Sequence, residues 1–183
     1  MNNFLAPNVV GGAEISVGNL SERLQDLGVK VVTMSLAESN ISDEHLSIEY
    51  PFLKRVWTLN NNRTLLDRLI FQFFSEKINF IYKPTIKKKI KAVAPDVIHT
   101  NNIAGIGSVI WEIARELKVP VIHTLRDYYQ ICARQTFYSK GENCIAAKRC
   151  RGCKILTAAR KKYSQTVDVV VGNSQKTLEL HID

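Results

Sequence analysis

Two adjacent glycines, Gly11 and Gly12, stand immediately before an amphipathic run that is expected to form a helix. Glycine has no Cβ atom, so a ligand can approach the backbone closely, and the N–H groups in the first turn of a helix have no partner inside the helix. Such groups bind phosphate. The pair therefore predicts a phosphate site, and a tight turn that needs a positive φ is the alternative explanation.

Polar side chains follow three short apolar segments that predict β-strands. They are His99, Thr100, Asn101 and Asn102 after the first segment, Thr124, Arg126, Asp127 and Tyr128 after the second, and Asn173 and Ser174 after the third. Parallel strands end at one edge of a sheet, and ligands bind outside that edge. We therefore expect a ligand site there. Burial in the core with a single hydrogen bond is the alternative for His99 and for His123, and it is favoured for His123.

The four cysteines lie close together in the sequence, at Cys132, Cys144, Cys150 and Cys153. The last two are separated by two residues, a spacing that lets both thiolates bind one tetrahedral metal ion. We expect a reducing compartment, which argues against structural disulfides. The segment therefore predicts a structural zinc site, and buried free thiols are the alternative.

The spacing of apolar residues predicts helices and strands that alternate along the chain. The predicted helices span 15–27, 63–79, 85–93, 103–117 and 154–165, and the predicted strands span 30–36, 46–50, 96–100, 120–124 and 168–171. Residues 1–5 look like the end of a first strand rather than a whole one. Short connections between strand and helix are typical of an α/β, Rossmann-like parallel sheet with helices on both faces. We expect a single domain over residues 1–183.

The net charge is +8, and the excess of Lys and Arg is concentrated in 83–91 and 148–162. This balance favours an anionic partner, which could be nucleic acid, an acidic lipid surface or a phosphorylated small molecule. Solvated helix faces are the alternative for both clusters. Nucleic acid is disfavoured because the chain has no recognised nucleic-acid-binding motif.

The predicted helix at 63–79 has a wide apolar stripe, and aromatic residues continue beyond it to Tyr82. Such a stripe is typical of a helix that covers a sheet, or, alternatively, of an acceptor or membrane-facing groove. The next helix contains four lysines, Lys87, Lys88, Lys89 and Lys91. A basic helix beside an aromatic one is typical of a membrane interface.

The sequence has no apolar run close to the ~20 residues of a membrane span. The first residues include Asn2, Asn3 and Pro7 where a signal peptide has basic and apolar residues. We therefore expect a cytoplasmic protein, peripheral at the inner face of the membrane if the basic helix contacts lipid.

Five segments together resemble the amino-terminal domain of family 4 glycosyltransferases. They are the Gly-Gly-Ala-Glu turn at 11–14, the Ala-Pro-Asp-Val-Ile-His-Thr-Asn-Asn segment at 94–102, the strand and turn at 119–129, the cysteine loop at 132–153 and the Val-Val-Val-Gly-Asn-Ser segment at 169–174. The cysteine loop is similar to that of one branch of the family. The segments occur in family order and span nearly the whole chain.

This resemblance implies one half of a GT-B enzyme, in which two Rossmann-like domains face each other across a cleft. The family implies a retaining, metal-independent transfer of a sugar, hexosyltransferase-like, from a nucleotide diphosphate sugar to a lipid-linked or polysaccharide acceptor. It also implies that this domain binds the acceptor, and that a carboxy-terminal donor-binding domain is absent from this chain. We therefore expect little or no transfer by the chain alone.

The resemblance places Gly11 and Gly12 against the donor diphosphate, with Asn101 and Thr124 at the same nucleotide-sugar site. It implies a catalytic site that includes His99, Arg126 and Asp127. Asp127 matches the Asp of a family His-Asp pair, whereas Arg126 replaces the His. Arginine stays charged and suits a carboxylate or a phosphate. Either the acceptor chemistry has changed, or Arg126 and Asp127 form a structural ion pair.

Two other functions remain open from the sequence. The chain could be a non-catalytic binding module, such as a split-gene subunit that pairs with a separate donor-binding chain or holds an acidic polymer or a lipid head group. The basic helices could also serve a nucleic-acid-binding protein, which the alternation of strand and helix disfavours. Zinc is expected only as a structural ion, and no cofactor is expected to take part in transfer.

Overall fold

The structure is a computed structural model that describes residues 1–9, 11–36, 44–48, 76, 79–145 and 150–182. Most of the helix predicted at 63–79 lies outside these residues, including Phe71, Phe73 and Phe74. The aromatic groove predicted there therefore falls outside the described part of the chain except for Phe80 and Tyr82, which are partly buried and pack against the core.

Helices and strands alternate along the chain, and the α/β class predicted from the sequence is confirmed. The helices are α1 (Gly12–Asp26), α4 (Lys83–Val93), α5 (Val109–Leu117), α6 (Arg151–Ser164) and α7 (Gln175–Ile182). The strands are β1 (Val32–Ser35), β2 (Glu44–Ser47), β3 (Ile98–Thr100), β4 (Val121–Leu125), β5 (Tyr138–Ser139), β6 (Glu142–Asn143) and β7 (Val169–Gly172). The β5–β6 hairpin and α7 have no counterpart among the predicted elements.

The extended segment 1–5 joins two parallel ladders, β1 with β2 and β3 with β4 and β7. On one side, the N–H of Asn2 donates to the carbonyl oxygen of Met34 in β1 at 3.1 Å. On the other side, the N–H of Asn3 donates to the carbonyl oxygen of Asn102, which follows β3, at 2.7 Å. The order across the sheet is therefore β2, β1, segment 1–5, β3, β4, β7. Numbered along the chain this is 3-2-1-4-5-6, the order of a Rossmann fold.

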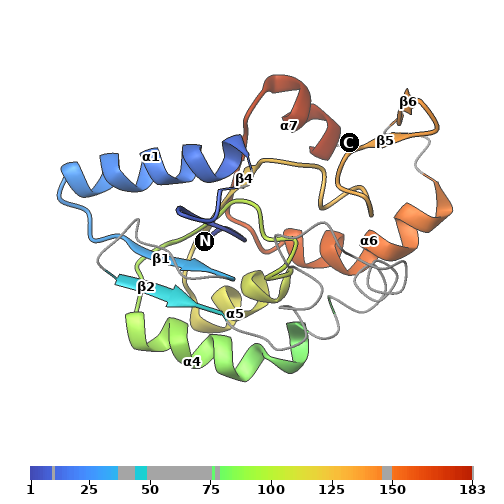
Figure 1. The fold of residues 1–183 in the computed structure, drawn as a ribbon. Helices are drawn as coiled ribbons and strands as arrows, with labels where there is room; N and C mark the ends of the chain where they lie inside the picture. Colours follow the sequence, from blue (N-terminus) through green and yellow to red (C-terminus); the bar gives the residue numbers. More distant parts are fainter. Residues whose placement is uncertain (10, 37–43, 49–75, 77–78, 146–149, 183) are drawn as a thin grey trace.

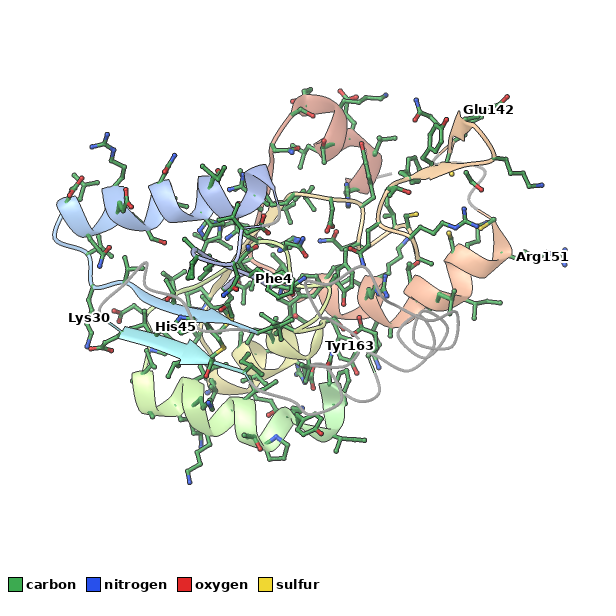
Figure 2. The ribbon with its side chains drawn as sticks, viewed as in Figure 1. Phe4, Lys30, His45, Glu142, Arg151 and Tyr163 are labelled. Atoms are coloured by element: carbon green, nitrogen blue, oxygen red, sulfur yellow. The ribbon has the colours of Figure 1, made fainter. Side chains whose placement is uncertain are left out.

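Helices cover both faces of this sheet. In Figure 1, α1 lies on one side of the strands, and α4 and α5 lie on the other. The core is built from β-branched and aromatic side chains at the centre of the molecule, where Phe4 lies, whereas Glu142 and Arg151 lie at its far edge (Figure 2). Trp111 in α5 is fully buried. The strands are thereby held rigidly between two helical layers.

The start of α5 differs from its prediction, because the helix begins at Val109 rather than at residue 103. The N–H groups of Gly105 and Ile106 donate to Oδ1 of Asn3, at 3.0 and 3.4 Å, so this stretch is tied to the first strand instead. Gly107 then adopts a φ of 84°, which favours glycine. The 103–107 loop therefore fixes the position of Asn3.

The Asn-Ser turn after β7 begins a further helix. Oγ of Ser174 accepts a hydrogen bond from the N–H of Thr177 at 3.1 Å, an N-cap contact for α7. A Cβ atom at Gly172 would lie 2.8 Å from Cβ of Leu178, so glycine lets the helix pack closely on the strand. The N-cap contact of Ser174 and the close packing at Gly172 therefore account for these two residues of the segment.

Candidate functional site

Two buried asparagines organise the carboxyl edge of the sheet between the first strand and β3. Asn2 and Asn3 are 0% and 1% exposed. Oδ1 of Asn2 accepts the N–H of Asn102 at 2.8 Å, and Nδ2 of Asn3 donates to Oδ1 of Asn102 at 2.7 Å. This is the point where the strand order reverses, which is where a Rossmann fold binds its ligands. Sequence analysis assigned no role to Asn2 or Asn3, since polar residues near a terminus give no signal of burial.

Gly11 and Gly12 lie at the start of α1, in a turn linked to this edge because Nδ2 of Asn2 donates to Oε1 of Glu14 at 3.4 Å. Neither has a positive φ, so the explanation as a tight turn does not apply. Glu14, 4% exposed, holds the turn instead, because its Oε2 accepts the N–H of Gly11 at 2.8 Å. A Cβ atom at Gly12 would have no atom within 4 Å. The backbone at Gly12 is therefore open to a ligand.

Arg126 lies after β4 and contacts the same edge of the sheet, because its Nε donates to Oδ1 of Asn101, which follows β3, at 3.1 Å. It makes no ion pair with Asp127. Oδ1 of Asp127 instead accepts the N–H of Tyr129 at 2.8 Å. Burial raises the pKa of Asp127 to about 6, opposed by that hydrogen bond and by the charge of Arg160. The ion-pair alternative for these two neighbours is therefore not supported.

The side chains of His99 and Thr124 bind each other, with Nε2 of His99 and Oγ1 of Thr124 2.8 Å apart. Burial, with smaller contributions from the amino terminus and Arg126, lowers the pKa of His99 to about 4. His99 is therefore a neutral hydrogen-bonding group near pH 7 and is poorly suited to protonate a leaving group. Its predicted place in the catalytic site stays a prediction, with hydrogen bonding as the role that this pKa allows.

His123 is a core residue, which is the alternative that the sequence favoured. It is 4% exposed, its Nδ1 lies 2.9 Å from Oγ1 of Thr100, and its ring packs edge-on against Trp111 at 5.1 Å. Burial lowers the pKa of His123 to about 3, so the ring is neutral. No ligand role is assigned to it.

A buried ion pair braces the turn that contains Asp127 and Tyr129. Nε of Arg160 lies 3.2 Å from Oε1 of Glu76, and the two side chains are 1% and 13% exposed. Arg160 also donates to the carbonyl oxygen of Tyr129 at 2.9 Å and stacks on its ring at 4.2 Å. The Tyr129 hydroxyl donates to Glu76, which also accepts from Ser108. Sequence analysis missed this network, because Glu76 and Arg160 are far apart in the chain.

The four cysteines are free thiols. Cys150 caps α6, and its Sγ accepts the N–H of Cys153 at 3.3 Å. Cys132, Cys144 and Cys153 contact a small apolar cluster with Phe137. Among the described residues, no group of three or more His, Cys, Asp or Glu side chains is arranged to hold a metal ion. The zinc prediction is therefore unsupported, and a cap plus apolar packing accounts for these thiols.

The lysines of α4 are largely engaged within the protein. Nζ of Lys87 lies 2.6 Å from Oε2 of Glu116, and Nζ of Lys89 donates to the carbonyl oxygen of Ser47 at 2.8 Å. Lys88 and Lys91 are exposed. Two of the four lysines assigned to a lipid surface thus have internal partners, which weakens that prediction. No helix in the described part of the chain is long and apolar enough to cross a membrane.

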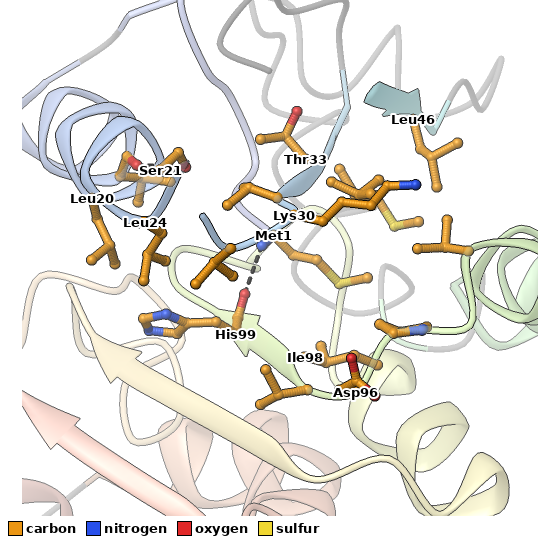
Figure 3. Close-up of a pocket in the computed structure, with 18 of the residues that line it drawn as sticks. Met1, Leu20, Ser21, Leu24, Lys30, Thr33, Leu46, Asp96, Ile98 and His99 are labelled. Carbon is orange, nitrogen blue, oxygen red and sulfur yellow. Dashed lines mark hydrogen bonds between the residues drawn. The ribbon is translucent and has the colours of Figure 1, made fainter. Parts of the chain in front are cut away.

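A cavity of about 330 Å³ lies between α1, β1 and β3 (Figure 3). Its lining is mostly apolar and extends from the amino-terminal ends of both strands, at Lys30 and Asp96, to His99 and Asn101. The buried amine of Met1 donates to the carbonyl oxygen of His99 at 2.6 Å beside it. Ligands of a Rossmann fold bind at the opposite ends of the strands. The cavity thus reaches Asn101 from the amino-terminal side of the strands, and the carboxyl edge beyond Asn101 is the better candidate site.

Comparisons with known proteins agree with the resemblance seen in the sequence. The family model described as Glycosyltransferase Family 4 matches residues 10–183. A Klebsiella pneumoniae protein described as an uncharacterized 42.6 kDa protein in cps region is 31% identical over 189 residues, which cover 100% of this chain and 50% of that protein. The chain thus spans about half the length of this relative. No solved structure matches.

Proposed function

The chain belongs to glycosyltransferase family 4, and from this we propose that it is the acceptor-side half of an enzyme of polysaccharide biosynthesis. The proposed reaction is transfer of a sugar from a nucleotide diphosphate sugar to a glycan or lipid-linked acceptor, retaining and metal-independent. The single observation that carries the proposal is the open backbone at Gly12, in a turn whose Glu14 contacts Asn2 at the carboxyl edge of the sheet.

The proposed chemistry is electrostatic. N–H groups at the start of α1 would bind the diphosphate as it departs, and a fixed donor of this kind needs no reorganisation during the reaction. Neutral His99 and Thr124 would form hydrogen bonds with a sugar hydroxyl. Asp127 would accept a hydrogen bond from a sugar hydroxyl. The Glu14 carboxylate already accepts the N–H of Gly11, so the N–H groups from Gly12 onward would be the donors to the diphosphate.

A second, donor-binding domain is part of the proposal, supported by the length of the Klebsiella pneumoniae relative. We propose that this half alone transfers little sugar. The enzyme would work in the cytoplasm, at the inner membrane face if the acceptor is lipid-linked. The exposed Lys88 and Lys91 and the basic surface of α6 are the described groups that could contact anionic lipid there.

A Gly12→Val substitution tests the phosphate role. The branched side chain would fill the space where the diphosphate approaches the backbone, so kcat/KM of this domain joined to a donor-binding domain should fall about 100-fold or more, similar to the loss of one oxyanion donor. Release of nucleoside diphosphate measures the rate. Because φ at Gly12 is not positive, the melting temperature should change little.

Gly152→Val is the matched control. Gly152 also lies in the first turn of a helix, has a φ that is not positive and has no atom within 4 Å of a Cβ position. Its neighbour Arg151 lies at the edge of the molecule, away from Phe4 in the first strand (Figure 2). Normal transfer by a folded Gly12→Val enzyme would remove the phosphate role and favour a binding module with no catalytic glycine turn.

A further inference from the structure

The Arg126 guanidinium is a half-buried cation without a counter-charge in the described part of the chain. No carboxylate there forms an ion pair with it. Its hydrogen bond to Asn101 uses Nε, so the two terminal nitrogens have no protein partner among the described residues. A guanidinium held in this way presents two parallel N–H groups, which suit a carboxylate or a phosphate.

The neighbouring carboxylates have other partners. Asp127 points its Oδ1 at the N–H of Tyr129 and is influenced by Arg160. Glu14 is 4% exposed and accepts from Gly11 and from Nδ2 of Asn2. Neither forms an ion pair with Arg126. Because a partly buried charge is costly unless it is paired, the arrangement calls for an anion from outside the described residues.

The described groups that interact with Arg126 carry no negative charge. The neighbouring ring of His99 is neutral at pH 7, because its pKa is about 4, and the Arg126 charge contributes to that shift. Asn101 fixes the guanidinium at the carboxyl edge of the sheet, at the crevice where ligands of this fold bind. An anionic group that approaches this edge would therefore meet an oriented pair of N–H groups that forms no ion pair with a described carboxylate.

We propose that Arg126 binds an anionic substituent, a carboxylate or a phosphate, on the acceptor substrate. This rests on the proposed function for the assignment to the acceptor, and on the geometry of Arg126 and Asn101 for the anion. The acceptor class would then be an acidic sugar or a sugar phosphate rather than a neutral glycan. Arg126 would set specificity without taking part in bond breaking.

Binding of small probes to the chain itself tests this without any transfer reaction. The probes are methyl glucuronide, which has a carboxylate, glucose 1-phosphate, which has a phosphate, and neutral methyl glucoside. Amide shifts in NMR titrations at fixed ionic strength report their affinities. We expect at least one anionic probe to bind near Asn101 and Arg126 at least about tenfold more tightly than methyl glucoside. The probe that binds identifies the source of the anion.

Three variants complete the test. Arg126→Gln should weaken the anionic probe about tenfold or more and leave methyl glucoside unchanged, whereas Arg126→Lys should recover only part of the loss, because lysine lacks the planar fork. Arg134→Gln is the matched control, since Arg134 is exposed and its removal changes the net charge equally. Melting curves of each variant confirm folding.

Three results would overturn the proposal. They are failure of both anions to bind the unaltered chain, equal binding by Arg126→Gln, and an equal loss in Arg134→Gln. UDP serves as a further probe. If Arg126→Gln weakens the binding of UDP but of neither sugar anion, Arg126 binds the donor diphosphate instead. Failure of the glycosyltransferase proposal itself would appear as an inactive unaltered enzyme, which these titrations do not require.

Discussion

An Arg160→Met variant should lose about 3–5 kcal/mol of unfolding free energy, because the substitution leaves a buried carboxylate without its counter-charge. Arg160 is 1% exposed, and its partner Glu76 has a side chain that is 13% exposed. The same change removes the hydrogen bond to the Tyr129 carbonyl and the stacking on its ring. Urea denaturation of the variant and the unaltered chain measures the difference.

Two comparisons isolate the ion pair. Adding Glu76→Gln to Arg160→Met should restore part of the lost stability, since the unpaired charge is then gone. Arg115→Met is the matched control, because Arg115 pairs with Glu112 at 2.8 Å but its side chain is 57% exposed. An exposed pair contributes about 0–1 kcal/mol. A loss in Arg160→Met no larger than that in Arg115→Met would show that Glu76 and Arg160 do not brace this turn.

Acidification should destabilise the chain because His123 is buried in its neutral form. Its pKa is about 3 in the folded chain against 6.5 for an unperturbed histidine, so the unfolded state binds more protons between these values. Stability is therefore fully present above about pH 6.5 and declines as the pH falls toward 3, by roughly 4 kcal/mol from this residue. His99 acts in the same direction, because its pKa is lowered to about 4.

Asp127 acts in the opposite direction, since its folded pKa of about 6 is above its ordinary value of 3.8 and the folded state binds more protons between them. A His123→Asn variant separates the effects, because the amide oxygen can replace Nδ1 as the partner of Thr100. Between pH 4 and pH 6 the slope of unfolding free energy against pH should fall by the amount that corresponds to about one proton taken up on unfolding. An unchanged slope would mean that His123 is not the group that titrates.

Much of the fold could be predicted from the sequence because its signals are local. Pro95 and Pro120 precede strands β3 and β4, and apolar runs of the expected length follow each of them. Gly28, with a φ of 79°, follows α1 as expected. The alternation of strand and helix then limits the architecture to a covered parallel sheet.

The remaining features depend on contacts that local patterns do not encode. Asn3 holds the 103–107 loop although it is 102 residues from Gly105 in the sequence, so α5 begins later than its apolar periodicity predicts. Lys87 looks solvated in the sequence but meets Glu116 of α5 across the helix pair. The candidate site could be predicted at the level of strand ends. Which side chains meet there, such as Arg126 with Asn101 rather than Asp127, depends on tertiary packing.

The central proposal is most directly tested by measuring release of nucleoside diphosphate from a panel of nucleotide diphosphate sugars. The protein assayed is this domain joined to a donor-binding domain, with and without a membrane fraction as the source of acceptor. We expect one sugar nucleotide to be consumed, the release to require acceptor, and this chain alone to give little release. Consumption of no sugar nucleotide by the folded two-domain protein, with or without acceptor, would contradict a role in glycosyl transfer.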